Sequence, residues 1–227
     1  MLKDLLFPKM CLVCNHAGTY ICLKCEIKLV PVKNDSCLYC GNTSYLGLTH
    51  EFCKQKNGVD GLLSVFVYNP TLKAIIRNLK YRGVYDAFHE LFFSIREPAI
   101  IKFYKLRRKN PAAFLQPIPL HKEKLLKRGF NQSVYIANFF RHITTYKVID
   151  VLVRSKNTSA QAQTKDRVSR VLNIKDAFSL RRNVSIDKKN IILVDDVVTT
   201  GSTVKEAATI LKRVGAHKIF VFSLGRD

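Results

Sequence analysis

The sequence has no cysteine after residue 53, no long apolar run and few acidic residues. All seven cysteines lie between positions 11 and 53, and this change in composition predicts a domain boundary near residue 60. The apolar runs are far too short to span a bilayer, and the first residues lack the apolar core of a signal peptide. We therefore expect a cytoplasmic protein with a cysteine-rich module over residues 1–60 and a larger domain over residues 61–227.

The shortage of acidic residues leaves a strongly basic chain. The 227 residues include 38 Lys and Arg but only 17 Asp and Glu, which gives a formal net charge of +21. Such a charge indicates polyanionic partners, either nucleic acid or phosphate-bearing ligands. A generally lysine-rich proteome or a solvated basic surface would produce the same balance, so charge alone does not decide between these interpretations.

The cysteines follow the spacing of zinc ligands. Each Cys-x-x-Cys pair can present two thiolates to one metal ion, and two pairs complete a tetrahedral Zn²⁺ site. A disulfide framework does not fit a cytosolic chain with this paired spacing. The first predicted site consists of Cys11, Cys14, Cys22 and Cys25. The small module cannot bury much apolar surface, so we expect zinc to supply part of its folding energy.

The second predicted zinc site needs a ligand other than cysteine. Cys37, Cys40 and Cys53 remain, and His50 stands at His-x-x-Cys spacing from Cys53. We therefore expect His50 to complete the second site, although a histidine in a surface loop is the alternative. Spacing also leaves open a crossed arrangement, in which the pair at 11 and 14 shares its metal with the pair at 37 and 40.

Residues 191–203 carry the clearest signal for ligand binding. The aliphatic residues 191–194 predict a buried strand, and Asp195 and Asp196 stand at its end. A hydroxyl- and glycine-rich loop follows, and apolar residues then recur at helical spacing, with Thr203 and Glu206 forming a predicted capping box. Backbone N–H groups and hydroxyls at a helix start can hold a phosphate, and two carboxylates can bind a ribose directly or through Mg²⁺. An ordinary buried strand that ends in two acids is the alternative.

The remainder of the larger domain predicts an α/β fold. Strands are expected over 62–68, 114–119, 148–153 and 218–224, and helices over 70–80, 84–106 and from Asn131 or Gln132 to His142. This alternation favours a mostly parallel sheet with flanking helices. Gly215 is expected just beyond the end of the last helix.

Several basic and aromatic residues are candidates for nucleic-acid or pyrophosphate contacts. Residues 154–163 form a polar stretch that resembles a mobile lid, and an exposed loop is the alternative. The candidate contacts are Lys80, Arg82, Arg128, Arg154, Lys156 and Arg167, with Tyr81, Tyr85, Phe130 and Tyr135 available for base stacking.

The segment 191–203 resembles the phosphoribosyl-pyrophosphate (PRPP) loop of type I phosphoribosyltransferases. That resemblance implies that Asp195 and Asp196 hold the ribose. It implies that the 5′-phosphate binds Thr199, Thr200, Gly201, Ser202 and Thr203.

Over nearly its full length the chain resembles the ComF family of ComFC and GntX-like proteins. The resemblance is carried by the paired cysteines, Leu79-Lys80-Tyr81, Pro117–His121, Arg128–Gln132, Gln161, Arg167, Asn173, Ala177-Phe178 and the PRPP-type loop. It implies a double zinc ribbon before a phosphoribosyltransferase-like domain. It also implies a role in natural transformation, handling single-stranded DNA beside a helicase-like translocase. The family commonly has cysteine where His50 stands.

Three functions follow from these features. The first is a DNA-uptake protein that retains a pocket for PRPP or a related sugar phosphate. The second is an active phosphoribosyltransferase that uses PRPP and Mg²⁺ on an unidentified base. The third is a zinc-stabilised scaffold that docks a translocase.

Overall fold

A five-stranded parallel sheet forms the centre of the protein in the computed structural model, which describes residues 8–82, 86–156, 177–182 and 184–227. The strand order is β1 (Gly61–Val67), β7 (Ile219–Arg226), β6 (Asn190–Val198), β2 (Ala113–Pro117) and β3 (Lys147–Val148). Every neighbouring pair in this sheet is parallel. The predicted α/β fold with a mostly parallel sheet is therefore confirmed.

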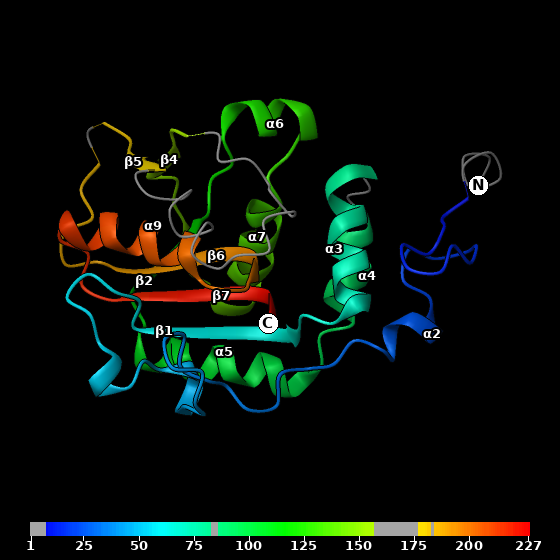
Figure 1. Cartoon of the computed structure of the whole chain (residues 1–227), viewed down its shortest axis with the longest axis horizontal. Coiled ribbons are helices and arrows are strands. Elements are labelled where there is room, and N and C mark those ends of the chain that lie inside the picture. The colour runs from blue at the N-terminus through cyan, green and yellow to red at the C-terminus, as the bar shows by residue number, and fades with distance from the viewer. Residues whose placement is uncertain (1–7, 83–85, 157–176, 183) are drawn as a thin grey trace.

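Helices cover both faces of the sheet (Figure 1), because the central strand alternates its aliphatic side chains between two cores. Ile192 and Val194 of β6 pack with α3 (Pro70–Arg82), α4 (Asp86–Phe93), α5 (Glu97–Lys109) and α7 (Gln132–Thr144). Ile191 and Leu193 pack on the other face with α9 (Ser202–Arg213). A strand buried on both faces needs this continuous apolar run.

The predicted single helix over residues 84–106 is wrong, because the chain forms two helices there. Helix α4 ends at Phe93, and α5 begins at Glu97 after Arg96, which has an extended backbone. Pro98 stands in the first turn of α5, where proline is tolerated because it removes no intrahelical hydrogen bond. None of the helices in the described parts of the chain is long and apolar enough to cross a membrane.

The predicted strand over residues 148–153 is also wrong. Only Lys147 and Val148 join the parallel sheet, and β4 (Leu152–Arg154) instead pairs antiparallel with β5 (Phe178–Leu180). The neighbouring strand β2 ends at Pro117, which has no N–H to continue the ladder. The Gln116 side chain accepts a hydrogen bond from the Val151 N–H at 2.7 Å and so fixes the departing chain.

The cysteine-rich segment runs along the β1 edge of the sheet (Figure 1). Val32 N–H donates to Val65 at 2.9 Å, and Val67 N–H donates to Val30 at 2.8 Å. The short helices α2 (Leu23–Glu26), η1 (Tyr45–Gly47) and η2 (Glu51–Cys53) belong to this segment. These hydrogen bonds cover an edge that would otherwise expose unpaired backbone groups. The division of the chain at residue 60 stays a prediction.

Candidate functional site

Residues 191–203 fold as a strand, a loop and the start of a helix, as predicted. Strand β6 ends at Val198 and α9 begins at Ser202, with Gly201 between them at a φ of 72°. This left-handed backbone is favourable for glycine, so the loop turns sharply into the helix. The open pocket at this turn is lined by Asp195, Val197, Val198, Thr199, Thr200, Gly201, Ser202, Thr203 and Val204.

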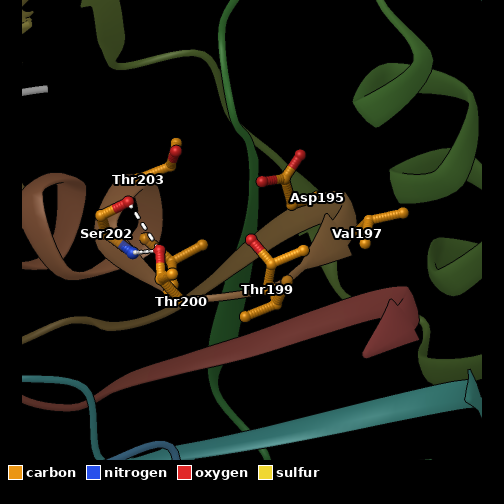
Figure 2. Close-up of a pocket in the computed structure, with 9 residues that line it drawn as sticks. Asp195, Val197, Thr199, Thr200, Ser202 and Thr203 are labelled. Carbon is orange, nitrogen blue, oxygen red and sulfur yellow. Dashed lines mark hydrogen bonds between the residues drawn. The ribbon is translucent and has the colours of Figure 1, made fainter. Parts of the chain in front are cut away.

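The hydroxyl groups of the loop lie across from an acid in this pocket. Figure 2 shows Ser202 and Thr203 on one side and the Asp195 carboxylate on the other, with Val197 pointing away. Thr200 Oγ1 and Ser202 Oγ lie 3.0 Å apart, within hydrogen-bond distance. Hydroxyls and backbone N–H groups at the start of a helix form a favourable site for a phosphate group.

The predicted capping box of α9 is not formed. Gly201 occupies the N-cap position, and α9 has no side-chain cap hydrogen bond. The Glu206 carboxylate instead accepts a hydrogen bond from the Ala177 N–H at 2.7 Å, which ties the helix to the segment before β5. At the other end, Gly215 adopts a φ of 95° and donates to Lys212, so the predicted glycine beyond the helix end is confirmed.

The two neighbouring acids are differently placed. Asp195 lines the pocket. Asp196 forms an ion pair with Lys80, near the end of α3, and both side chains are largely buried. Successive side chains on a strand point to opposite faces, which explains this difference.

Burial raises the pKa of Asp195 to about 7, and the negative charge of Asp196 adds to this shift. The cations of Lys80 and Arg154 oppose it. Burial also acts against the charge of Lys80, but the Asp196 carboxylate outweighs it and raises the Lys80 pKa. A divalent cation or a ligand hydroxyl at Asp195 would meet a carboxyl group that is poised between its two protonation states.

Four cationic side chains gather beside the acidic pair. Burial lowers the pKa of Lys124, and the charges of Arg154, Arg128 and Lys80 lower it further. Arg128 donates to Gln132 Oε1 at 2.7 Å. The structure therefore brings together three of the predicted basic residues and adds Lys124 of α6 (Lys122–Arg128). No local pattern distinguishes Lys124, which is one lysine among several in a basic run.

The remaining predicted basic contacts are Arg82, Lys156 and Arg167. Lys156 is exposed after β4, and Arg82 is the last residue of α3. Arg167, Gln161 and Asn173, together with the Arg82 side chain, lie outside the described residues. Phe130 is only 6% exposed and packs edge-on against Phe88, so its predicted availability for base stacking is wrong.

The first cysteine group forms as predicted. The ligand atoms of Cys11, Cys14, Cys22 and Cys25 lie within 4.8 Å of one another. The second group consists of Cys37, Cys40, His50 and Cys53 at the same spacing. The crossed arrangement is therefore wrong, because each group collects pairs that are consecutive in the sequence.

His50 is oriented as a metal ligand. Its Nδ1 lies 3.3 Å from Cys40 Sγ, whereas its Nε2 lies 3.2 Å from the Thr43 carbonyl oxygen. A proton on Nε2 can be donated to that carbonyl, which leaves the Nδ1 lone pair directed at the cysteine group. A hydrogen bond from the other ring nitrogen to a backbone carbonyl is typical of histidine bound to zinc.

The first cysteine of each group has a lowered pKa, which favours the thiolate form. Burial opposes ionisation of Cys11, but the backbone groups of Cys22, Cys14 and Val13 outweigh burial and lower its pKa to about 6. Burial likewise opposes ionisation of Cys37, and neighbouring backbone groups lower its pKa to about 6. Burial, and then the neighbouring thiols, instead raise the pKa of Cys25 and raise that of Cys53 to about 11. Thiolates are the form that binds zinc, so Zn²⁺ binding would release protons from these cysteines.

Comparison with known proteins identifies two regions of the chain, a zinc-binding region and a phosphoribosyltransferase-like region. The double zinc ribbon domain matches residues 2–55, and the phosphoribosyl transferase domain matches residues 127–224. Competence protein ComFC of Bacillus subtilis (strain 168) is 30% identical over 218 residues, which cover 91% of this chain and 84% of that protein. The chain belongs to the ComF family.

Two further relatives agree with this assignment to the ComF family. Competence protein F of Haemophilus influenzae is 28% identical over 228 residues, which cover 90% of this chain and 96% of that protein. DNA utilization protein YhgH of Escherichia coli (strain K12) is 29% identical over 235 residues, covering 96% and 97% of the two chains. The family match explains why a double zinc ribbon and a phosphoribosyltransferase-like domain occur in one chain.

Proposed function

We propose that this ComF protein handles incoming single-stranded DNA in the cytoplasm during natural transformation and uses the pocket at Asp195 and residues 197–204 to bind a phosphoribosyl-type ligand. The names of the relatives concern competence and DNA utilization. The net charge of +21 supports a polyanionic partner. The family resemblance adds a helicase-like translocase as a protein partner.

The phosphate pocket is the observation that carries the proposal. Asp195 faces Ser202 and Thr203 across a pocket at the start of α9 (Figure 2). Anions bind favourably at helix N-termini because the backbone N–H groups and the helix dipole both attract them. The charges of Lys80 and Arg154 act on Asp195, and Lys124 interacts with both of these cations and with Arg128. This positive charge suits a ligand with a second phosphate group such as PRPP.

The experiment compares three proteins: the wild type, the double variant Asp195→Asn/Asp196→Asn, and Asp187→Asn. Asp187 is exposed and does not line the pocket, so it serves as the matched control. PRPP binding with Mg²⁺, single-strand binding and transformation frequency are measured in parallel. We expect the double variant alone to lose PRPP binding. Transformation that persists without PRPP binding would show that the pocket is dispensable for uptake.

Single-strand binding is tested by its salt dependence. Lys and Arg contacts release counterions from the strand, so the logarithm of affinity should fall steeply with the logarithm of salt concentration. For single strands the slope is about −0.7 for each phosphate neutralised. Binding that does not change between low and physiological salt would contradict an electrostatic DNA contact.

Phosphoribosyl transfer is the second candidate function. The observation that favours it is the intact Asp195, Asp196 and 199–203 segment, which suits a PRPP–Mg²⁺ complex. Positioning of the reactants and stabilisation of the transition-state charge would supply most of the rate acceleration in such a transfer. Pyrophosphate release, screened across bases, tests it directly. Measurable PRPP binding with no release would leave a binding role only.

A further inference from the structure

We propose that the second zinc ribbon positions the phosphate loop, through Leu38 and Tyr39, which stand between the zinc ligands Cys37 and Cys40. The proposal goes beyond the function above and uses it only in naming PRPP as the probe ligand. It makes Leu38 and Tyr39 positioning residues, because they act on the loop at residues 199–203 and do not line the pocket.

Leu38 lies directly behind the turn at Gly201. A Cβ atom added to Gly201 would lie 2.7 Å from Leu38 Cδ1, so the glycine backbone packs against this side chain. Leu38 is only 7% exposed and belongs to the same apolar core as Val198 and Val204. These two residues flank the phosphate loop, so Leu38 belongs to the apolar core into which both ends of the turn pack.

Tyr39 contacts the loop through Lys205 of α9. Its ring centroid lies 4.8 Å from Lys205 Nζ, and Lys205 donates a hydrogen bond to the Thr200 carbonyl at 3.3 Å. The Tyr39 hydroxyl accepts a hydrogen bond from the Val59 N–H at 2.8 Å, which fixes the ring. A cation held over an aromatic ring loses freedom, so Tyr39 restrains the lysine that holds Thr200.

The ribbon itself is fixed to the sheet. Arg226, at the end of β7, donates to the Cys37 carbonyl at 3.0 Å and to the Ser36 carbonyl at 2.5 Å. Lys102 of α5 forms an ion pair with the largely buried Asp35 at 3.0 Å. Zinc bound by Cys37 and Cys40 would hold both ends of the Leu38-Tyr39 dipeptide. The position of the loop therefore depends on an intact second ribbon.

The first ribbon provides a matched control because its contacts lie elsewhere. Leu12 follows Cys11 as Leu38 follows Cys37, and it is only 3% exposed. Leu12 packs in the opposite core, and its carbonyl accepts a hydrogen bond from Asn78 of α3 at 2.5 Å. Removing the Leu12 side chain creates a comparable cavity in the other ribbon, away from the phosphate loop.

The experiment uses the full-length, zinc-loaded protein and the variants Leu38→Ala and Leu12→Ala. Zinc content, amide hydrogen exchange over residues 198–206 and PRPP binding with Mg²⁺ are measured for each. We expect Leu38→Ala to keep the zinc content of the wild type, to exchange amides of this segment about tenfold faster and to bind PRPP about tenfold more weakly. Leu12→Ala should match the wild type in exchange over this segment and in PRPP affinity.

Unchanged exchange over residues 198–206 in Leu38→Ala would overturn the proposal, as would equal acceleration in Leu12→Ala. A wild type that binds no PRPP would contradict the proposed function, and the exchange comparison would still decide the positioning role. If Leu38→Ala does not fold, Tyr39→Leu replaces it, because this variant removes the ring under Lys205 and keeps apolar volume. Tyr39→Leu should then accelerate exchange at Thr200, and exchange at the rate of the wild type would overturn the proposal.

Discussion

The ammonium group of Lys80 pairs with the carboxylate of Asp196 and so joins the end of α3 to β6 beside the phosphate pocket. The pair is largely shielded from solvent, with 26% of the Lys80 side chain and 14% of the Asp196 side chain exposed. Its charge also acts on Asp195, because Lys80 opposes the rise in the pKa of that acid. Lys80 therefore offsets part of the negative charge of the acidic pair.

Replacing Lys80 with methionine should destabilise the protein at neutral pH. The substitution leaves the partly buried Asp196 carboxylate without its cation, and such a loss costs about 1–3 kcal/mol. Thermal or urea unfolding at pH 7.5 measures the change. Lys73→Met is the matched control, because Lys73 stands on the same helix and is exposed. Equal stability of the two variants would contradict a stabilising role for the ion pair.

The raised pKa of Asp195 predicts a loss of stability as pH rises. Folding keeps a proton on this carboxyl group above the usual value of 3.8, so the folded state binds more protons than the unfolded state between pH 4 and about 7. The free energy of unfolding must then fall across this window. We expect Asp195→Asn to be more stable than the wild type at pH 8, by about 1–4 kcal/mol, and similar to it at pH 4.

Urea unfolding of Asp195→Asn at several pH values, with Asp187→Asn as an exposed control, tests this linkage. Asp187→Asn should follow the wild type at every pH. A stability difference between Asp195→Asn and the wild type that does not depend on pH would contradict the raised pKa.

Patterns within one short segment were predictable. The strand before Asp195, the loop after Asp196 and the cysteine pairs each depend on residues that are close in the sequence, and the structure forms all three. Periodicity and ligand spacing report local geometry, which tertiary packing preserves here. His50 was also identified by its spacing from Cys53.

Contacts between distant segments could not be predicted. Nothing near Lys80 identifies Asp196 as its partner, and nothing near Leu38 points to Gly201. The division of the 84–106 helix and the departure of the chain after Val148 depend on how neighbouring elements end, which sequence periodicity does not record. The predicted capping box was wrong for the same reason, because the Glu206 carboxylate accepts a hydrogen bond from the distant Ala177 N–H.

Each ribbon should bind its own zinc ion. We expect two zinc ions per wild-type chain by elemental analysis, and one in Cys14→Ser and in Cys40→Ser, because each variant breaks one four-ligand group. His50→Cys should retain two ions, since thiolate is an equivalent ligand, whereas His50→Ala should lose one. Two ions in His50→Ala would show that His50 is not a ligand. Simultaneous loss of both ions in Cys14→Ser would contradict independent sites.

Introducing a methyl group at Gly201 should lower the free energy of unfolding for two separable reasons. The left-handed backbone at a φ of 72° disfavours any L side chain by about 1–2 kcal/mol, and collision with Leu38 adds about 1–3 kcal/mol. Gly41→Ala isolates the first cost, because Gly41 has a φ of 77° and a Cβ there meets nothing within 4 Å. Urea unfolding should therefore show a larger loss for Gly201→Ala than for Gly41→Ala.

The double variant Gly201→Ala/Leu38→Ala tests the collision itself. Truncating Leu38 makes room for the new methyl group, so the two substitutions should cost less together than the sum of their separate costs, by about 0.5–3 kcal/mol. The pair Gly41→Ala/Leu38→Ala should be additive, since a methyl group at Gly41 meets no Leu38 atom within 4 Å. Additivity in both pairs would contradict the contact between Leu38 and the phosphate loop. A favourable interaction confined to the Gly201 pair would locate the coupling at the turn that precedes α9.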